Sequence, residues 1–205
     1  MQGRVRRKSF AERRQRRADV DDPEVVLAAA ARFLEARARS VGEVRRRLTQ
    51  AGSRSELVEG AIARLGDLGM LDDEAFARAW VESRDRARPR GESALRRELS
   101  LKGLDRATID AALDARRRGE RTVRLGEAAP ADVAASEADG RSPDEAAARR
   151  LLDRRGAALR REPDPRVRRQ KAYALLARNG FDPGTCRDVA TAWVGASDEE
   201  RDPED

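Results

Sequence analysis

Residues 44–52 read VRRRLTQAG, and the same order of an apolar residue, arginines, a leucine and a closing glycine returns as LRRELSLKG at 95–103. A third, degenerate copy reads AYALLARNG at 172–180. After each glycine, apolar residues recur at the sixth and tenth positions, which is the spacing of one helical face. A short helix ended by glycine that recurs at intervals of tens of residues is typical of a modular helical array.

The expected helices begin at residues that cap helices. Asp22 offers a side-chain acceptor ahead of Pro23, and Ser40 with Glu43 makes a capping box. No stretch sustains the apolar/polar alternation that predicts a strand. We therefore predict an all-α protein of tandem three-helix modules, three repeats with about nine helices, forming an elongated, curved array. The predicted segments are a basic disordered tail at 1–22, modules at 23–70, 71–118 and 143–195, a flexible linker at 119–142 and an acidic tail at 196–205.

The second module opens with the sequence LDDEAF at 71–76. Asp72 suits the N-cap, and acids in the first turn complement the helix dipole. Leu71 and Phe76 occupy the two ends of a hydrophobic staple, and Trp80 shares a helix face with Phe76. Capping explains the run of carboxylates, so it does not predict a metal site.

Composition limits both the cores and the chemistry. The chain has 205 residues, 39% of them apolar and 3% aromatic, which allows only thin cores. It has no histidine and a single cysteine, Cys186, which excludes an internal disulfide and a cysteine-based zinc site. Phosphate-loop and dinucleotide-binding motifs are missing. We expect no enzyme activity, no cofactor and no metal, and a monomer in the cytoplasm that neither carries a secretory signal nor spans a membrane.

Arginine placement carries the functional prediction. If Val44 and Leu48 are buried, helical geometry directs Arg46 outward and leaves its neighbours on the flanks, and the second copy repeats this arrangement. Such basic patches on separate modules suit phosphates or carboxylates. The predicted contact residues are Arg45, Arg46, Arg84, Arg88, Arg90, Arg96, Arg97, Arg154, Arg155, Arg168 and Arg169.

An alternative interpretation applies to each of these arginines. Such a side chain can simply be a solvated surface residue that pairs with a local acid, for example Glu43, Asp85 or Glu98. The basic N-terminal tail leaves a similar choice open, and the role of the acidic tail is open as well. Residues 1–17 carry eight basic side chains against one acid, and both nucleic-acid contact and solubility explain them.

The sequence GMLDDEAFARAWVESR at 69–84, followed by LRRELSLKG, resembles the central motif of the RecX family of recombination regulators. The resemblance covers about 25–194, although the linker before the third module is longer than the family pattern. It implies tandem three-helix modules that bind the RecA recombinase and its nucleoprotein filament and restrain its recombinase, ATPase and co-protease activities, with DNA as a further partner. It brings no catalytic residues. The residues that carry the structural pattern are Gly52, Leu71, Asp72, Asp73, Phe76, Ala77, Trp80, Leu99, Gly103 and Gly180.

Two other functions remain open at this stage. Three-helix modules with basic helices resemble helix-turn-helix units, so a DNA-binding protein that acts without the recombinase is one alternative. A passive helical scaffold for an unrelated partner is the other.

Overall fold

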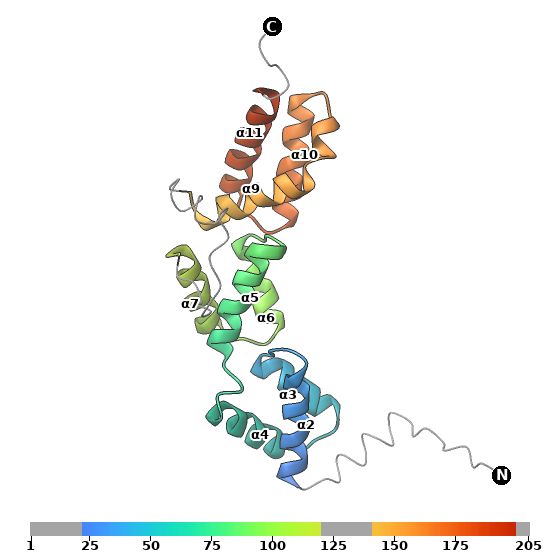
Figure 1. Cartoon of the computed structure of the whole chain (residues 1–205), viewed down its shortest axis with the longest axis vertical. Coiled ribbons are helices and arrows are strands. Elements are labelled where there is room, and N and C mark those ends of the chain that lie inside the picture. The colour runs from blue at the N-terminus through green and yellow to red at the C-terminus, as the bar shows by residue number, and fades with distance from the viewer. Residues whose placement is uncertain (1–21, 120–140, 200–205) are drawn as a thin grey trace, which may run out of the picture. The chain divides into compact units, whose positions relative to one another are not determined.

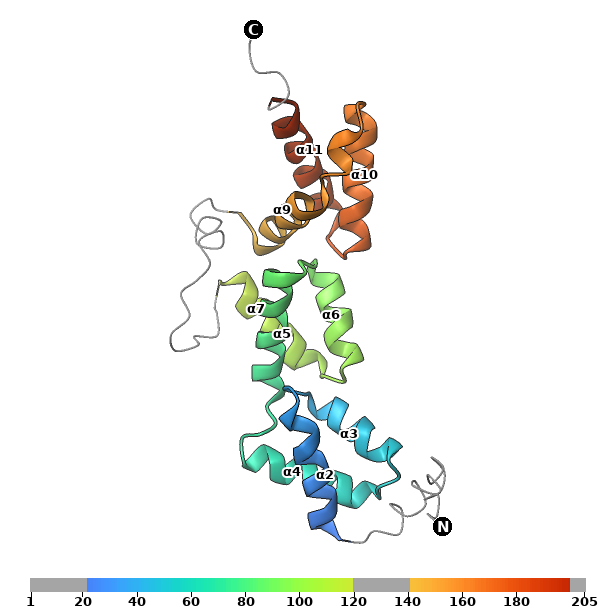
Figure 2. The same ribbon diagram turned by 45° about the vertical axis from the view of Figure 1, so that its right-hand side comes forward.

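The structure is a computed structural model and describes residues 22–119 and 141–199 (Figures 1 and 2). Its described residues form two compact units: unit 1 holds 22–76 with 102–105, and unit 2 holds 77–101, 106–119 and 141–199. Every regular element in these ranges is a helix, nine of them α-helices, so the all-α prediction is confirmed. Nearly all of the predicted basic tail and linker, and residues 200–205 of the predicted acidic tail, lie outside the described residues. The elongated, curved array stays a prediction.

Unit 1 contains the first three-helix module. Helix α2 (Pro23–Glu35) packs against both α3 (Val41–Gln50) and α4 (Ser55–Asp67), and α3 packs against α4. Each helix buries one apolar stripe, as the spacing in the sequence predicts. The shared core consists of Val26, Ala30, Val44, Leu48, Val58, Ala61, Ile62, Leu65 and Leu71.

Capping residues fix where the helices begin, as predicted. Asp22 accepts a hydrogen bond from the backbone N–H of Glu24 at 2.9 Å. The Ser40 hydroxyl accepts from the N–H of Glu43 at 3.1 Å, and the Glu43 carboxylate accepts from the N–H of Ser40 at 3.3 Å, which completes the capping box. Asp72 caps α5 (Asp73–Ala87) by accepting from the N–H of Ala75 at 2.9 Å.

Glycines in the left-handed conformation end the helices at the three repeated positions. Gly52, Gly103 and Gly180 have φ angles of 94°, 87° and 84°. A side chain in this region of φ is strained, whereas glycine adopts it freely. The closing glycine of the repeat therefore has the role that the sequence predicts.

The chain's second three-helix module, most of which lies in unit 2, is formed by α5, α6 (Glu92–Leu101) and α7 (Arg106–Arg117). α5 starts in unit 1 and continues into unit 2. The apolar seam of the module is buried, and Ala77, one of the residues that carry the predicted structural pattern, is 0% exposed. The buried apolar residues from these helices in unit 2 are Ala77, Val81, Leu95, Leu99, Ile109, Ala112, Leu113 and Ala115.

The third module consists of α9 (Pro143–Arg155), a 3-10 turn η1 (Leu159–Arg161), α10 (Pro165–Arg178) and α11 (Pro183–Glu199). α10 and α11 pack against each other, and both contact α9. α11 continues to Glu199, beyond the predicted module end at residue 195. The core is formed by Ala147, Ala148, Leu151, Leu152, Ala172, Leu176, Phe181, Cys186, Val189, Ala190, Trp193 and Val194.

Candidate interaction surfaces

The first arginine of each complete repeat is bound to an acid of the following helix. Arg45 donates two hydrogen bonds to Glu59, at 2.6 and 2.7 Å, and Arg96 donates to Asp110. Both pairs join residues that are 14 positions apart, so the same contact is found within each of the first two modules. The pairs raise the pKa of each guanidinium, chiefly through the hydrogen bond to the carboxylate. These two predicted contact residues therefore already have a partner within their own module.

The second arginine of the repeat is exposed. Arg46 lies on α3 and Arg97 on α6, both facing solvent as predicted. Within the described part of the chain, no carboxylate pairs with either one. The Arg46 guanidinium lies against the backbone of Gly103, where an added Cβ would be 3.3 Å from its Nη1. Both side chains are available to an anionic partner.

Around Arg46, unit 1 gathers more cations than acids. The Glu43 carboxylate is 2.9 Å from the Arg37 guanidinium, 3.9 Å from that of Arg39 and 3.3 Å from the Lys102 ammonium. Burial by itself would raise the pKa of Glu43, but the Arg37 hydrogen bond, together with the Ser40 N–H and Lys102, lowers it below its ordinary value. One ionised carboxylate thus faces three cations. We call this set the Glu43 cluster.

An aromatic ring extends the cluster along the module. The Arg39 guanidinium stacks 4.2 Å from the centre of the Phe33 ring, and that of Arg47 lies 5.7 Å from the same ring. Arg47 follows Arg46 on α3 and is also exposed. The exposed cations of this set are Arg37 and Arg47, whereas the side chains of Arg39 and Lys102 are only 17% and 14% exposed.

Unit 2 repeats this chemistry around Glu98 on α6. The carboxylate accepts hydrogen bonds from the Trp80 indole at 2.9 Å and from Arg84 at 2.6 Å, and the Arg90 guanidinium is 3.6 Å away. Arg84 also stacks 4.1 Å from the centre of the Trp80 ring. We call this set the Glu98 cluster. It brings Arg84 and Arg90 together, as their clustering in the sequence predicts, and Arg97 lies beside Glu98 on the same helix.

The remaining predicted contact residues fall into different environments. Arg88, Arg155 and Arg169 are exposed, whereas Arg154 donates to the backbone carbonyl of Ala87 at 3.2 Å. The prediction that Arg168 is a surface contact is wrong, because its side chain is buried at 1% exposure. The physical reason is helical spacing. On α10, residues 168, 172 and 176 are four apart and share the face that packs on the core.

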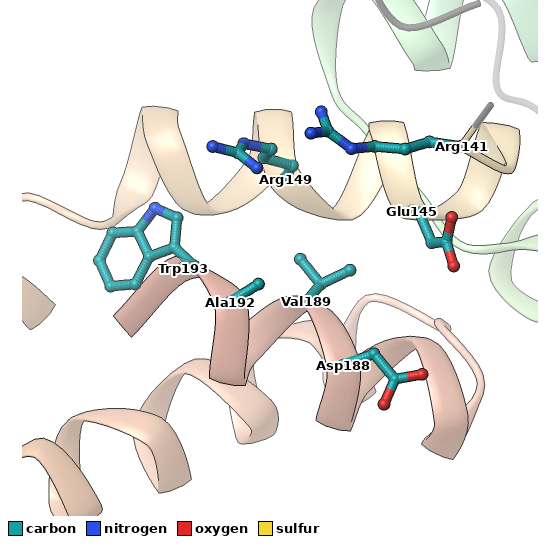
Figure 3. A pocket seen from close by; sticks show the side chains of 7 residues that line it. All are labelled: Arg141, Glu145, Arg149, Asp188, Val189, Ala192 and Trp193. Atoms are coloured by element: carbon teal, nitrogen blue, oxygen red, sulfur yellow. The ribbon is translucent and has the colours of Figure 1, made fainter. Parts of the chain in front are cut away.

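A pocket of about 230 Å³ lies between α9 and α11 in the third module (Figure 3). Val189, Ala192 and Trp193 of α11 form its apolar side. The charged residues that line it carry both signs and number two of each: Arg141, Arg149, Glu145 and Asp188. The pocket therefore has no net charge preference for an anion, unlike the two clusters.

Several members of the cationic surfaces were not predicted as contacts. Lys102 is 59 residues from Glu43, so no local pattern could place it there. Phe33 and Arg39 lie near the end of α2 and in the loop after it, where periodicity gives no contact partner. A usable signal was that Arg37 and Arg39 immediately precede the capping box of α3.

These surfaces are suited to binding anions. Guanidinium groups bind phosphates and carboxylates through paired hydrogen bonds, and stacking on a ring holds the guanidinium plane in place. Among the described residues there is no cluster of acids or thiols with the composition of a metal site. Nor does any described helix have the length and apolar character needed to cross a bilayer.

The repeated fold and its two cation clusters define an all-α protein built from tandem three-helix modules. Three family models match the chain in order: RecX first three-helix domain at residues 27–65, second at 72–113 and third at 143–189. The chain belongs to the RecX family.

Named relatives and solved structures agree with this assignment. The regulatory protein RecX of Thermobifida fusca (strain YX) is 34% identical over 76% of this chain and 78% of its own length. That of Mycobacterium sp. (strain KMS) is 34% identical over 83% and 82%. The crystal structure of RecX from Lactobacillus salivarius has the same fold, with a TM-score of 0.64 at 18% identity over 86% of this chain and 98% of that one.

Proposed function

We propose that this protein binds the RecA recombinase and its nucleoprotein filament and restrains recombinase, ATPase and co-protease activity in DNA repair and the SOS response. Family membership and the resemblance of the 69–84 motif support this target. The observation that carries the proposal is the exposed arginine repeated at one position of two modules, Arg46 and Arg97, each beside a cluster in which cations outnumber the acid.

The mechanism follows from multivalency. A filament offers the same acidic or phosphate groups at regular intervals, so several weak patches engage it at once. Linking patches in one chain makes the later contacts intramolecular, which raises the overall affinity without any new type of contact. A regulator that binds one filament state better than another shifts the population toward that state, and it needs no catalytic group of its own.

The test is ATP hydrolysis by RecA on single-stranded DNA, measured against increasing concentrations of this protein. We expect the wild-type chain to inhibit hydrolysis. The double variant Arg46→Glu, Arg97→Glu should need at least a tenfold higher concentration for half-inhibition, because each substitution replaces an attraction by a repulsion. A folded double variant with full potency would contradict our choice of surface.

A matched control separates position from net charge. Arg64 of α4 and Arg187 of α11 are exposed arginines on the third helix of their modules. The variant Arg64→Glu, Arg187→Glu changes the net charge equally and should inhibit like the wild type. Equal loss in both variants would indicate a general charge effect instead of a defined surface.

The cation clusters also favour a second candidate, a DNA-binding protein that acts without the recombinase. Phosphate contacts would then dominate, and affinity for bare DNA would fall steeply as salt rises. Tight binding to bare DNA, measured by fluorescence anisotropy, together with unchanged ATP hydrolysis by RecA would select this function. If the chain bound neither DNA nor filament, both proposals would fail and a scaffold for another partner would remain.

A further inference from the structure

Unit 2 contains a buried arginine that connects the second module to the third. Arg116, in the last turn of α7, has a side chain only 6% exposed. Its Nε and Nη2 donate to the two carboxylate oxygens of Asp85 on α5, at 2.8 and 2.9 Å. Its Nη1 donates to Asp144, in the first turn of α9. Arg116 and Asp144 are 28 residues apart in the sequence, so this ion pair joins the end of the second module to the start of the third.

The carboxylate of Asp144 makes a further contact. Its second oxygen accepts a hydrogen bond from the backbone N–H of Glu92, the first residue of α6, at 3.1 Å. Asp144 therefore reaches α6 directly and, through Arg116, both α5 and α7. Burial by itself would lower the pKa of Arg116, but the two carboxylates raise it well above its ordinary value, so the guanidinium stays charged. We call Asp85, Arg116 and Asp144 the Arg116 bridge.

A contact between two backbones joins the same modules at another place. The N–H of Gly91 donates to the carbonyl of Asn179 at 3.0 Å, and the Ser93 hydroxyl donates to the carbonyl of Gly180 at 2.7 Å. A Cβ added at Gly91 would lie 2.2 Å from the Gly180 carbonyl oxygen, closer than atoms can approach. Only glycine allows this contact.

Unit 1 contains the same kind of contact. The Ser40 hydroxyl donates to the carbonyl of Lys102 at 2.7 Å, and a Cβ added at Gly42 would lie 2.5 Å from that oxygen. In both places a serine and a glycine at the start of one second helix meet the loop with the left-handed glycine that ends another. In unit 2 the Arg116 bridge adds buried ion pairs to the contact between the second and third modules.

We propose that the Arg116 bridge and the Gly91 contact are both needed to hold the second and third modules as one rigid body, so that loss of either one loosens the third module without unfolding it. Removing one partner of a buried ion pair is costly because the other charge stays buried. Asp144 is the partner whose removal leaves Arg116 paired with Asp85, so its loss removes an ion pair between the modules and keeps the one within the second module. A free third module would lose its register with the second and hence its share of the avidity.

The direct test measures the distance between spin labels on introduced cysteines at Ser100 of α6 and Gln170 of α10, which are both exposed. Native Cys186 is buried and does not compete for the label. The otherwise unchanged chain should give one narrow distance distribution. Asp144→Ala should give a broad one while circular dichroism shows that helix content is retained. A distribution that stays narrow would overturn the proposal.

Two further variants distinguish docking from a local effect at α9. Gly91→Ala disturbs the contact between the second and third modules at Gly180 and changes no charge. It should broaden the distance distribution as well. Asp188→Ala removes an exposed carboxylate from the same module, and Gly195→Ala adds a methyl group where no atom lies within 4 Å. Both controls should keep the narrow distribution. Broadening by the controls would count against the Arg116 bridge.

The consequence for regulation rests on the proposed function. In the ATP hydrolysis assay, Asp144→Ala should raise the half-inhibiting concentration about tenfold, because a loosened third module keeps only part of the effective concentration that the rigid chain gives it. A broad distance distribution with unchanged inhibition would overturn this part of the proposal. If the wild type itself did not inhibit, the proposed function would fail, whereas the distance measurement would still decide whether the bridge holds the modules together.

Discussion

The first two modules and the third share one helical pattern but differ in surface chemistry. In the first two, an arginine seven residues before the closing glycine pairs with an acid seven residues after it, as Arg45 does with Glu59. In the third, the same positions hold Tyr173 and Arg187. The leucine four residues before the glycine and the glycine itself are kept in all three. The buried seam and the helix stop therefore define the module, while its surface ion pairs differ from one module to another.

The largest effect should come from the shared seam. Leu48, Leu99 and Leu176 occupy the same position of the repeat and are 3%, 0% and 0% exposed. Each substitution by alanine should lower the free energy of unfolding by about 2–5 kcal/mol, because it removes a buried side chain and leaves a cavity. Denaturant unfolding followed by circular dichroism measures this. Leu101, which is 71% exposed, provides the control, and its substitution should change stability by less than about 0.5 kcal/mol.

If Leu176→Ala proved as mild as Leu101→Ala, the third module would not share the packing of the others. The degenerate AYALLARNG copy would then be a repeat in sequence only.

An intermediate effect should separate two capping boxes. Ser40 and Ser142 both cap a helix and pair with a glutamate three residues on. Ser142→Ala should cost about 1 kcal/mol, the usual value for a lost N-cap. Ser40→Ala should cost about 2 kcal/mol, because Ser40 is fully buried and its hydroxyl also donates to the Lys102 carbonyl. Thermal unfolding of both variants gives the comparison, and equal losses would show that this long-range hydrogen bond contributes nothing.

The smallest effect should come from the Arg45–Glu59 ion pair, which the third module lacks because Tyr173 and Arg187 stand at these positions. Glu59→Gln breaks the pair with Arg45, whose side chain is 45% exposed, so the loss should stay below about 0.5 kcal/mol. In 1 M salt the loss should disappear because the charges are screened. Arg187 stands where the first two modules have the acid of the pair. The change in the free energy of unfolding caused by Arg187→Gln should therefore be the same at low and at high salt. A salt-dependent loss at Arg187 would indicate an ion pair there and weaken the contrast between the modules.

Sequence patterns predicted the helical fold because the relevant forces are local. Capping boxes act within three residues, glycine ends a helix through its own φ angle, and the apolar seam repeats at the period of one helix. The same spacing placed Arg46 and Arg97 correctly on the exposed side. Arg168 is the exception, because it lies at the helical spacing that continues the buried seam of Ala172 and Leu176, so the basic composition around it does not bring it to the surface.

Local patterns in the sequence were enough to place the starts and ends of the helices, the apolar face of each helix and the outward direction of Arg46 and Arg97. Which charges meet depends on how the helices pack: Lys102 meets Glu43, Arg90 meets Glu98, and Arg116 meets both Asp85 and Asp144. The physical reason is that backbone conformation depends on neighbours in the chain. An ion pair depends instead on which helices pack together, and no local pattern records that.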